Sequence, residues 1–410
     1  MTTEITSCRI SGSPNLIPIL NLGIQELTGV FPASTGEEVT KGPLELVWCP
    51  ESCLVQLRHT YDSDELYGDN YGYRSGLNRS MVEHLENMVE YFLKIIDLDN
   101  DDVVVDIGSN DGTLLKCYKQ KNITKIGIDP TGNKFLEYYD DGTILVPEFF
   151  SYDSFRSQVP SKKAKIVTSI AMFYDLERPL DFVRQVAEIL DDDGIWHFEQ
   201  SYMPSMLRMN AYDTVCHEHI EYYSLMNIKY MLDRCGLNII DVKMNAINGG
   251  SFAVTAAKKS NRLVSNDAII DWLLAQERSA GLSTTSPFRL FEDRVFQHRN
   301  NLMELVQALC RAGKTIVGYG ASTKGNVLLQ FCGFTAKEIP CIAEINPDKF
   351  GKYTPGTHIP IVSEEEAKAI NPDYLLVLPW HFKEGIIRRE KDFLMKGGKL
   401  IFPLPEIEIY

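Results

Sequence analysis

The sequence predicts an α/β fold: a small N-terminal unit, a central domain with a doubly wound parallel sheet, and a second α/β domain. Two observations carry this prediction. From residue 102 onward, β-branched runs alternate with helical segments, which favours parallel sheets covered by helices. A strand followed by a glycine turn and a helix also occurs twice, at 103–115 and at 315–326. The 410 residues can fill two or three cores, because single cores rarely exceed about 250–300 residues.

The N-terminal stretch differs in texture from the rest. Residues 1–80 contain scattered turn residues and short apolar runs, which predict a small irregular unit rather than a regular layer. Residues 81–96 follow with apolar side chains at helical spacing, which predicts an amphipathic helix.

The remaining elements divide into two series. The first series of predicted strands comprises 103–107, 124–128, 164–170, 194–198 and 251–257, with a helix at 113–121. A long charged helix at 287–312 leads to the second series, at 315–319, 339–344, 374–378 and 399–402. We therefore expect an N-terminal lobe at 1–80, a central domain at 81–285 and a C-terminal domain at 286–410.

Charge and composition exclude several classes of protein. The formal net charge is -15, which argues against a nucleic-acid or anionic-membrane partner. No apolar run reaches the roughly 18–20 residues that span a bilayer, and residues 1–9 lack the features of a signal peptide. The nine cysteines are scattered along the chain. Reduced thiols in a cytoplasmic protein are the simplest interpretation.

The first glycine turn is the strongest single motif. A buried strand reaches Asp106, Gly108 permits a tight turn, and Gly112 stands where a helix begins. Ser109, Asn110 and Asp111 occupy the middle, so the three glycines that seat a pyrophosphate are missing. This pattern favours a ligand that carries an amino acid and a sulfonium, namely S-adenosylmethionine.

Acidic residues are predicted to hold the two ends of this cofactor. Asp106 is placed for the cationic amino end, and Asp129, which ends the next strand, for the ribose hydroxyls. The predicted cofactor-binding set is Asp106, Gly108, Asn110, Asp111, Gly112, Asp129, Pro130 and Met172. An ordinary turn and helix cap of an α/β fold is the alternative interpretation.

Several longer strings occur together in this chain. They are Tyr71-Gly-Tyr-Arg-Ser-Gly76, Ser169-Ile-Ala-Met-Phe-Tyr-Asp-Leu-Glu177, Cys216-His-Glu-His-Ile-Glu-Tyr-Tyr-Ser224, Asn248-Gly-Gly-Ser-Phe252, Gly318-Tyr-Gly-Ala-Ser-Thr-Lys-Gly-Asn326 and Tyr353-Thr-Pro-Gly-Thr-His-Ile-Pro360. Their combination and order resemble the S-adenosylmethionine-dependent C-methyltransferases that modify nucleotide-linked deoxy keto-sugars, a group that includes the sugar C3-methyltransferase of tetronitrose biosynthesis. The resemblance spans nearly the whole chain.

This resemblance implies a zinc-binding-like N-terminal lobe, a central Rossmann-like class I methyltransferase domain and a second Rossmann-like α/β domain. It also implies a dTDP- or GDP-linked 4-keto-6-deoxy sugar between the outer lobes, methylated at C3. Three lobes can enclose a site within one chain, so we expect a monomer or a weak homo-oligomer.

Methylation at carbon requires a base that removes a proton beside a ketone. His217, Glu218 and His219 offer candidates, and in an extended segment the two histidines would share one face. Glu221 stands where a second zincin histidine is required, which excludes that motif. The resemblance points to His219 as the base and to Glu218 as the residue that orients it or contacts substrate. Some relatives have a tyrosine at the position of Cys216, so Tyr73 and Tyr174 become the candidates for contacts with the sugar.

The second glycine turn is predicted to serve the nucleotide-sugar without a cofactor of its own. Gly318 and Gly320 fit a dinucleotide pattern, but Thr323 replaces the third glycine. Lys324 is placed to meet a diphosphate beside a helix start. The full predicted substrate-binding set is Tyr71, Arg74, Tyr222, Asn248, Gly320, Ser322, Lys324, Glu344, Asn346, Tyr353 and His358. Trp380 and His381 extend the polar-aromatic group of the same domain.

The N-terminal lobe contains an incomplete set of residues for the zinc site that the resemblance implies. Structural zinc takes four Cys or His ligands, often as two C-x-x-C pairs. Here Ser11 and Ser52 stand three residues after Cys8 and Cys49. Cys8, Cys49 and Cys53, with His59, remain as an irregular candidate set.

Three other functions stay open at the level of sequence. An O- or N-methyltransferase of another small metabolite would need no enolate. A nucleotide-sugar-binding protein without catalysis is the second alternative, although Asp106 and Asp129 beside the histidine pair speak against it. A NAD-dependent oxidoreductase is the weakest, since both glycine turns depart from the pyrophosphate pattern.

Overall fold

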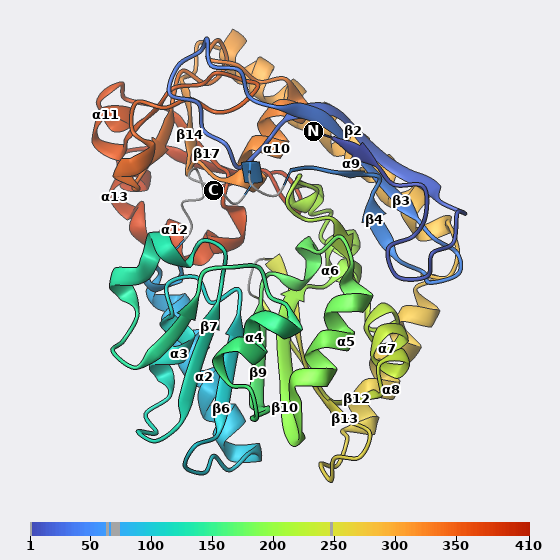
Figure 1. Cartoon of the computed structure of the whole chain (residues 1–410). Coiled ribbons are helices and arrows are strands. Elements are labelled where there is room, and N and C mark those ends of the chain that lie inside the picture. Colours follow the sequence, from blue (N-terminus) through green and yellow to red (C-terminus); the bar gives the residue numbers. More distant parts are fainter. Residues whose placement is uncertain (1, 63–64, 67–73, 247–248) are drawn as a thin grey trace.

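The computed structural model describes residues 2–62, 65–66, 74–246 and 249–410. Three units are visible in Figure 1: a central sheet with its helices at the bottom, an N-terminal sheet at the upper right, and a C-terminal α/β unit at the upper left. The predicted α/β class is confirmed.

The central unit contains a seven-stranded sheet with the order β12-β13-β10-β9-β6-β7-β8. Its strands are β6 (Val103–Ile107), β7 (Thr124–Ile128), β8 (Thr143–Val146), β9 (Ala164–Ile170), β10 (Leu190–Ser201), β12 (Leu237–Asn245) and β13 (Ser251–Lys258). All five residues of β6 are buried, as expected for a strand covered on both faces. The predicted strand at 251–257 forms, but it runs antiparallel to both neighbours rather than continuing the parallel series.

Helices cover both faces of this sheet (Figure 1). They are α2 (Arg79–Ile95), α3 (Thr113–Cys117), α4 (Tyr152–Gln158), α5 (Pro179–Ile189), α7 (Leu225–Arg234) and α8 (Asp267–Ser279). Helix α2 confirms the predicted amphipathic helix: Leu85, Met88, Val89 and Phe92 form its buried stripe. Helix α3 is shorter than predicted.

The N-terminal unit is more regular than its sequence predicted. Strands β2 (Ile17–Glu26), β3 (Lys41–Trp48) and β4 (Val55–Leu57) form an antiparallel sheet, and β1 (Thr3–Glu4) pairs with β5 (His59–Thr60). The prediction of an irregular unit was therefore wrong. Two shifts of register between β2 and β3 interrupt the alternation of buried and exposed side chains, which removes the period of two by which a strand is recognised.

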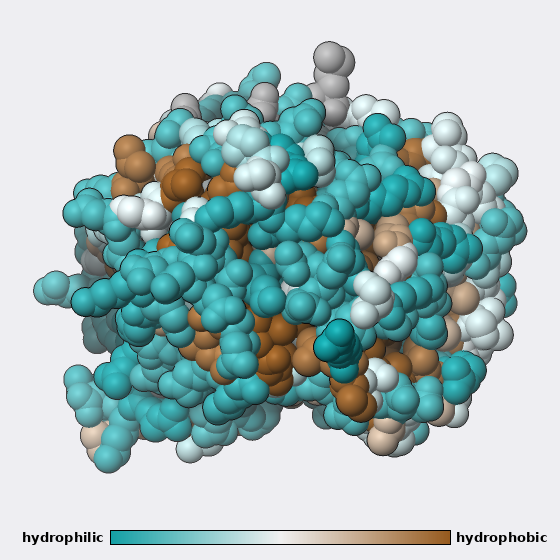
Figure 2. Space-filling view, turned by 60° about the horizontal axis from the view of Figure 1, so that its bottom comes forward, coloured by the Kyte–Doolittle hydropathy of each residue, from teal (hydrophilic) through white to brown (hydrophobic). Residues whose placement is uncertain are grey.

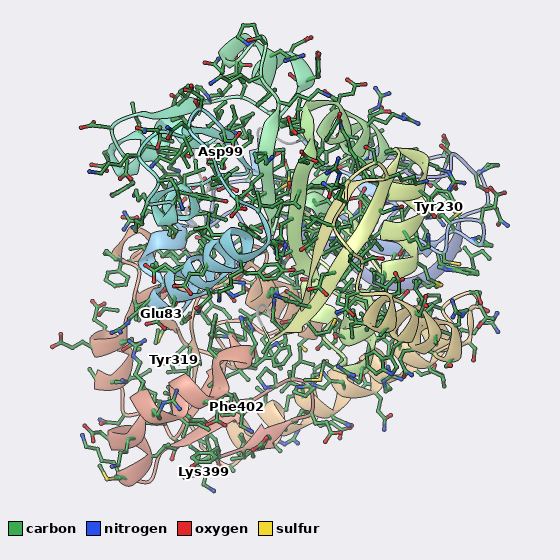
Figure 3. All side chains as sticks on the ribbon, turned by 90° about the horizontal axis from the view of Figure 1, so that it is seen from below. Glu83, Asp99, Tyr230, Tyr319, Lys399 and Phe402 are labelled. Atoms are coloured by element: carbon green, nitrogen blue, oxygen red, sulfur yellow. The ribbon has the colours of Figure 1, made fainter. Side chains whose placement is uncertain are left out.

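The C-terminal unit contains a six-stranded sheet with the order β16-β15-β14-β17-β18-β19. Its strands are β14 (Ile316–Tyr319), β15 (Ile342–Glu344), β16 (Ile361–Ser363), β17 (Tyr374–Val377), β18 (Lys399–Phe402) and β19 (Glu408–Ile409). All pairings are parallel except that of β19. Its helices are α10 (Thr323–Cys332), α11 (Glu364–Ala369), α12 (Lys383–Arg389) and α13 (Lys391–Met395). Figure 3 places Tyr319, Lys399 and Phe402 in this unit.

One segment of the central unit packs into the other two. Helix α6 (Met203–Arg208), the turn η4 (Tyr212–Thr214) and β11 (Glu221–Tyr222) follow β10. Strand β11 adds a fourth strand to the N-terminal sheet beside β4. The apolar side chains of 203–222 share one core with β2–β4, with the long helix α9 (Ser286–Arg311) and with the C-terminal sheet. This segment carries three of the predicted catalytic residues, His217, Glu218 and His219, and both outer units hold it in place.

The face shown in Figure 2 is mostly hydrophilic, with hydrophobic side chains gathered in separate patches. Among the residues that the structure describes, no helix has the length and hydropathy to cross a membrane.

Candidate active site

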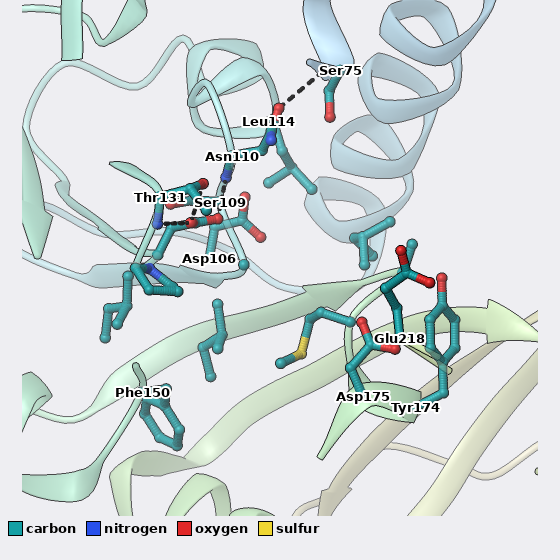
Figure 4. Close-up of a pocket in the computed structure, with 18 of the residues that line it drawn as sticks. Ser75, Asp106, Ser109, Asn110, Leu114, Thr131, Phe150, Tyr174, Asp175 and Glu218 are labelled. Atoms are coloured by element: carbon teal, nitrogen blue, oxygen red, sulfur yellow. Dashed lines mark hydrogen bonds between the residues drawn. The ribbon is translucent and has the colours of Figure 1, made fainter. Parts of the chain in front are cut away.

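A cavity of about 390 Å³ opens at the carboxyl ends of the central strands. One end is lined by the turn after β6 and by Asp129, Pro130 and Thr131 after β7; the other end is lined by Glu218, His219 and the start of α10. Figure 4 shows this arrangement, with Asp106, Asn110 and Thr131 at one side and Tyr174, Asp175 and Glu218 at the other. Ligands bind at this edge of open α/β sheets.

The glycines of the first turn allow the backbone to line the cavity closely. Gly108 has φ +75°, and a Cβ there would lie 2.9 Å from Cγ of Met172. Gly112 has φ +70°, and a Cβ there would lie 3.0 Å from the Tyr139 ring. Both positions therefore favour glycine, for their backbone conformation and for lack of space.

Asp129 fastens two loops together. Its Oδ2 accepts the backbone N–H of Asn110 at 2.8 Å, and its Oδ1 accepts the backbone N–H of Thr131 at 2.7 Å and the Thr131 hydroxyl at 2.6 Å. The dashed lines of Figure 4 trace part of this arrangement. Oδ1 thus has two donors and Oδ2 has one, so Oδ2 has capacity for a further donor.

Asp106 is 4% exposed, and its Oδ1 accepts the Thr168 hydroxyl at 2.6 Å. Burial raises the pKa of Asp106 to about 7, an effect that the Thr168 hydrogen bond opposes and the nearby Asp129 charge reinforces. A cation beside Asp106 would favour the ionised carboxylate. Asp106 therefore stays the predicted partner of the cofactor's cationic amino group.

Asn110 and Asp111 hold the segment before α2 rather than only the turn. Asn110 Oδ1 accepts the backbone N–H of Ser75 at 2.9 Å, and Asp111 Oδ2 accepts that of Gly76 at 3.0 Å. Arg74 lies 3.6 Å from the same Asp111 oxygen, and its guanidinium lies 4.1 Å from the centre of the Tyr138 ring. Arg74 was predicted to bind the sugar, but the structure places it against the cofactor turn.

These residues fit the predicted cofactor. The cavity supplies a buried carboxylate, closely packed glycines, an apolar wall that includes Met172 and Phe150, and Pro130 beside the ribose candidate. We therefore assign this end of the cavity as the cofactor pocket; the roles of individual residues remain predictions.

His219 lies at the other end of the cavity. Its Nδ1 lies 3.1 Å from the carbonyl oxygen of Thr214, and since that oxygen can only accept, Nδ1 carries the proton and Nε2 keeps a lone pair. Its ring contacts Tyr174 edge to face, with centroids 4.4 Å apart. Burial, and then the charge of Lys324, lower the pKa of His219 to about 3. The imidazole is therefore neutral near pH 7.

Glu218 lines the same end of the cavity, and burial raises its pKa. The N-terminal unit restricts its position, since a Cβ at Gly29 would collide with Glu218 Oε1. A loop from the first 30 residues thus borders the predicted catalytic pair.

The orientation predicted for the two histidines was wrong. Glu218 and His219 both line the cavity, whereas His217 does not. His217 is fully buried, lies 3.4 Å from the Thr28 hydroxyl through Nδ1, and packs against Tyr61. The chain bends at 217 and 218, so the two-residue alternation of an extended strand does not apply. His217 belongs to the packing of the N-terminal unit.

The start of α10 brings the cationic side chain of Lys324 to the same end of the cavity as His219. Thr323 and Lys324 line the cavity, and the Lys324 charge lowers the pKa values of His219 and His381. Burial lowers the pKa of Lys324, while the Asp213 charge opposes that effect. Asp213 accepts a hydrogen bond from the Trp380 indole at 2.7 Å, so Trp380 fixes this carboxylate rather than facing the cavity.

The second glycine turn does not line this cavity. Glu344 accepts the backbone N–H of Ala321, Ile345 and Asn346 at 2.7–2.9 Å. Ser322 caps α10, and Asn346 caps the turn η6 (Pro347–Lys349). Gly320, Ser322, Glu344 and Asn346 therefore lie together at the carboxyl ends of β14 and β15, where an α/β sheet binds nucleotides.

The other predicted substrate residues are distributed more widely. Tyr353 donates its backbone N–H to Pro32 O at 2.9 Å, which joins the C-terminal unit to the N-terminal unit. His358 occupies a tight turn with φ +52°. Tyr222 is buried, and its hydroxyl donates to Thr214 O at 3.3 Å, the same carbonyl that orients His219. Tyr71, Tyr73 and Asn248 lie outside the described residues.

Three residues near the site were missed. Asp175 and Thr323 line the cavity, and Asp213 accompanies Lys324. Asp175 directly follows Tyr174 within one of the quoted strings, so its place in that string was the available signal. Nothing in the local sequence marks Asp213, because Trp380, its hydrogen-bond partner, lies 167 residues away.

The predicted zinc ligands do not form a metal site. Within the described ranges, no group of three or more His, Cys, Asp or Glu side chains converges to hold a metal ion. The Cys53 thiol faces the carbonyl oxygen of Pro50 at 3.9 Å, and His59 lies in β5, which pairs with β1. The structure therefore does not bring Cys8, Cys49, Cys53 and His59 together as one ligand group.

Three protein-family models match the chain in succession. They are described as "Putative zinc binding domain" over 8–67, "Methyltransferase domain" over 76–242 and "C-methyltransferase C-terminal domain" over 246–405. Among curated proteins, the C-methyltransferase NovU of Streptomyces niveus is 33% identical over 409 residues, covering 98% of this chain and 96% of NovU.

Solved structures give only weak likenesses. The complex between the Haloferax volcanii Trm112 methyltransferase activator and a methyltransferase matches 45% of this chain and 94% of that chain, with 16% identity and a TM-score of 0.36. The plantazolicin methyltransferase BpumL with SAH matches 43% and 82%, with 12% identity and a TM-score of 0.34. At these scores nothing is inferred from them. On the family models and the full-length relative, the chain belongs to the C-methyltransferase family and is an S-adenosylmethionine-dependent enzyme.

Proposed function

We propose that this enzyme methylates C3 of a nucleotide-linked 4-keto-6-deoxy sugar, with His219 as the base. The observation that carries the proposal is the content of one cavity: a neutral imidazole with a free Nε2 lone pair, a cofactor turn and a lysine. Carbon methylation requires such a base, whereas the lysine suits a phosphorylated substrate.

The proton transfer follows from the geometry of His219. Thr214 O holds the Nδ1 proton, which leaves Nε2 to accept the proton from C3 of the sugar. As the C3–H bond breaks, its electron pair moves toward the ketone oxygen at C4, and an enolate forms. Tyr174, packed against the His219 ring, limits the ring's rotation. When bound, S-adenosylmethionine supplies an electrophilic methyl group to the enolate carbon.

The charge of Lys324 links substrate binding to the strength of the base. In the free enzyme, this charge contributes to the low pKa of His219. An anionic phosphate next to Lys324 would offset the charge, and the pKa of His219 would rise toward its ordinary value. The base therefore becomes stronger when a phosphorylated substrate is bound.

The pocket residues would hold the cofactor from two sides. Asp106 would pair with its cationic amino end, and Asp129 Oδ2 would accept from a ribose hydroxyl. Gly108 would allow the backbone to approach it. Phe149, Phe150 and Leu176 contribute apolar side chains to the cavity wall.

The test is proton exchange followed by NMR in D2O. With dTDP- and GDP-linked 4-keto-6-deoxy sugars, we expect enzyme-dependent loss of the C3 proton signal, and a new C-methyl signal once S-adenosylmethionine is added. His219→Gln should abolish both signals while cofactor affinity stays within about twofold, since a general base contributes roughly 10²–10⁴-fold to rate.

His217→Gln is the matched control, because His217 lies outside the cavity lining. It should retain exchange once any loss of stability is corrected for. Methylation without C3 exchange, or a methylated oxygen or nitrogen, would overturn the proposal in favour of another acceptor atom. Exchange that survives in His219→Gln and is lost in Glu218→Gln would transfer the role of base to Glu218.

A further inference from the structure

The N-terminal unit contains two matched turns, which we call the knuckles: residues 8–13 and residues 49–54. In the first knuckle, Cys8 donates its backbone N–H to the carbonyl oxygen of Ser13 at 2.8 Å. In the second, Cys49 donates to the carbonyl oxygen of Leu54 at 2.9 Å. The first and sixth residues of both knuckles are thus joined by the same hydrogen bond.

The correspondence extends to the fourth residue of each knuckle. Ser11 Oγ accepts the backbone N–H of Ser13, and Ser52 Oγ accepts that of Leu54, both at 3.3 Å. The fifth residue has a positive φ in both knuckles, +75° at Gly12 and +56° at Cys53. The two turns therefore repeat one geometry, with a cysteine at the first position and a serine at the fourth.

The side chains of the two knuckles meet in crossed pairs. Cys8 Sγ lies 3.2 Å from Ser52 Oγ, and Cys49 Sγ lies 3.5 Å from Ser11 Oγ. Cys8 is 2% exposed and Cys49 is fully buried. Burial raises the pKa of Cys49, but the hydrogen bonds of Ser11 and Ser52 outweigh it, and the net shift is downward.

This arrangement has the positions of a four-ligand metal site but not its chemistry. Structural zinc is held by four thiolates or imidazoles, commonly from two C-x-x-C pairs. Each knuckle keeps one thiol and presents a neutral hydroxyl at its second position. Two thiols do not complete a tetrahedral site, and the Cys53 thiol lies 3.9 Å from Pro50 O and takes no part in the crossed pairs.

We infer that this chain closes the zinc-binding domain of its family without a metal ion. Crossed thiol–hydroxyl pairs and packing against the methyltransferase unit replace the zinc. The N-terminal lobe is therefore insensitive to chelators, and its thiols are not metal ligands.

Contacts around the knuckles supply the stabilisation that zinc would otherwise give. The Asn227 amide at the start of α7 donates to Ser52 O at 2.7 Å. The Arg9 side chain, inside the first knuckle, donates to Leu57 O at 2.7 Å and to the Thr60 hydroxyl at 2.9 Å. Cys8, Ile10, Cys49 and Leu54 share a core with α7 and the central sheet. The knuckles are thus docked on a larger domain.

The geometry also predicts how the metal site could be regained. Because the fourth residues of both knuckles face the opposite thiols, Ser11→Cys combined with Ser52→Cys would present four thiols to one point. Only two side-chain atoms change, and the backbone of both knuckles stays as it is. This double variant tests the inferred positions directly.

The experiment measures zinc per chain by plasma mass spectrometry on full-length protein purified from zinc-supplemented cells. We expect less than about 0.1 zinc in the natural chain and about one zinc in the Ser11→Cys/Ser52→Cys variant. The melting temperature should fall with a chelator only in the double variant, since zinc bound to the folded state stabilises it.

Two controls keep the outcomes distinct. Adding Cys53→Ser to the double variant should leave its zinc content unchanged, because the Cys53 thiol lies outside the crossed pairs. If the double variant does not fold, the zinc content of the natural chain still tests the inference. Stoichiometric zinc in the natural chain, lost on Cys8→Ser or Cys49→Ser, would overturn the inference. A folded double variant that binds no zinc would also contradict it.

Discussion

The turn after β6 and the turn after β14 are each held by hydrogen bonds to an acidic side chain from the neighbouring strand. In each unit an acidic residue at the end of the second strand accepts a backbone N–H from the first turn: Asp129 from Asn110, and Glu344 from Ala321. Each also accepts backbone N–H groups from its own following loop. The two sheets also share a strand order at this point. In the central sheet β6 lies between β7 and β9, and in the C-terminal sheet β14 lies between β15 and β17.

The two turns differ in what they present to a ligand. The first strand of the central unit carries the buried carboxylate Asp106, and its turn lines the cavity. Strand β14 ends instead in Tyr319, whose hydroxyl donates to Glu390 at 2.9 Å. The second unit reaches the same cavity only through Thr323 and Lys324 at the start of α10. The same strand-turn-helix arrangement thus forms the pocket wall in the central unit, whereas in the C-terminal unit it places Lys324 at the edge of that pocket.

The largest effect is expected for Lys324→Met. Loss of a charged hydrogen-bond partner for phosphate costs about 1.5–3 kcal/mol, or roughly 10–150-fold in kcat/KM. Removing the charge also raises the pKa of His219 in the free enzyme, so more of the imidazole is protonated at acidic pH, and the acid limb of kcat/KM against pH shifts upward. Steady-state kinetics from pH 5 to 9 measure both effects.

Lys349→Met is the matched control for Lys324→Met. Lys349 is a lysine of the same unit that donates to Ala321 O at 2.7 Å and does not line the cavity. Its pH profile should keep the natural acid limb. If both variants shifted that limb equally, the effect would reflect the unit's overall charge rather than contact with the base.

The next prediction distinguishes the roles of Asp129 and Glu344, the acidic residues that hold the two turns. Asp129→Ala should weaken cofactor binding by about tenfold or more, since it removes a ribose partner and loosens the Asn110 backbone. Glu344→Ala should lower stability by about 1–3 kcal/mol, because several backbone N–H groups lose their acceptor, and should leave cofactor affinity unchanged. Calorimetric titration with S-adenosylhomocysteine and thermal melting distinguish them. Equal cofactor losses in both variants would remove the distinction between the turns.

A smaller effect is expected from the titration of Asp106, a buried carboxylate that has no counterpart at the end of β14. The pKa of Asp106 is about 7 in the free enzyme, above its value in an unfolded chain, so Asp106 becomes protonated as the pH falls below 7. A cationic ligand favours the ionised form. S-adenosylmethionine should therefore bind up to about tenfold more weakly for each pH unit below 7. Asp106→Asn should bind weakly with a flat profile; a persistent slope in this variant would assign the titration to another group.

The smallest effect is the contrast between two glycines. Gly108 and Gly320 have φ values of +75° and +82°, and a Cβ would lie 2.9 Å from Met172 and 2.8 Å from Pro379, respectively. Alanine at either position should cost roughly 1–2 kcal/mol in unfolding free energy, because the left-handed conformation disfavours a side chain. Only Gly108→Ala should also weaken cofactor binding. Denaturant melts and cofactor titration of both variants provide the comparison.

Much of the fold could be predicted from local sequence. The strands Val103–Ile107, Thr124–Ile128 and Ala164–Ile170 begin and end where their β-branched runs do. Helix α2 followed from apolar spacing, since burial on one face leaves a period that the sequence records. The N-terminal sheet was missed because the register shifts in β2 erase that period.

The candidate site was predictable only in part. Asp106, Gly108 and Asp129 were found because one turn and its following strand bring them together. The relation between His217 and His219 was predicted wrongly, because a bend at 217–218 depends on packing of 203–222 between both outer units. The contact of Arg74 with the cofactor turn could not be predicted for a similar reason: Asp111, its partner, lies 37 positions later in the chain.

The sequence alone determined the class of fold, the cofactor turn and the absence of paired C-x-x-C ligands, since each depends on residue types at short spacing. His219 was singled out among three candidate bases only by the family resemblance. The tertiary structure decided which of these meet. It brought Lys324 to His219 and Asp213 to Trp380. It also placed each knuckle's cysteine against the serine of the other knuckle. Such contacts join residues far apart in the chain, and their distances are set by how the three units pack on one another, which no local pattern records.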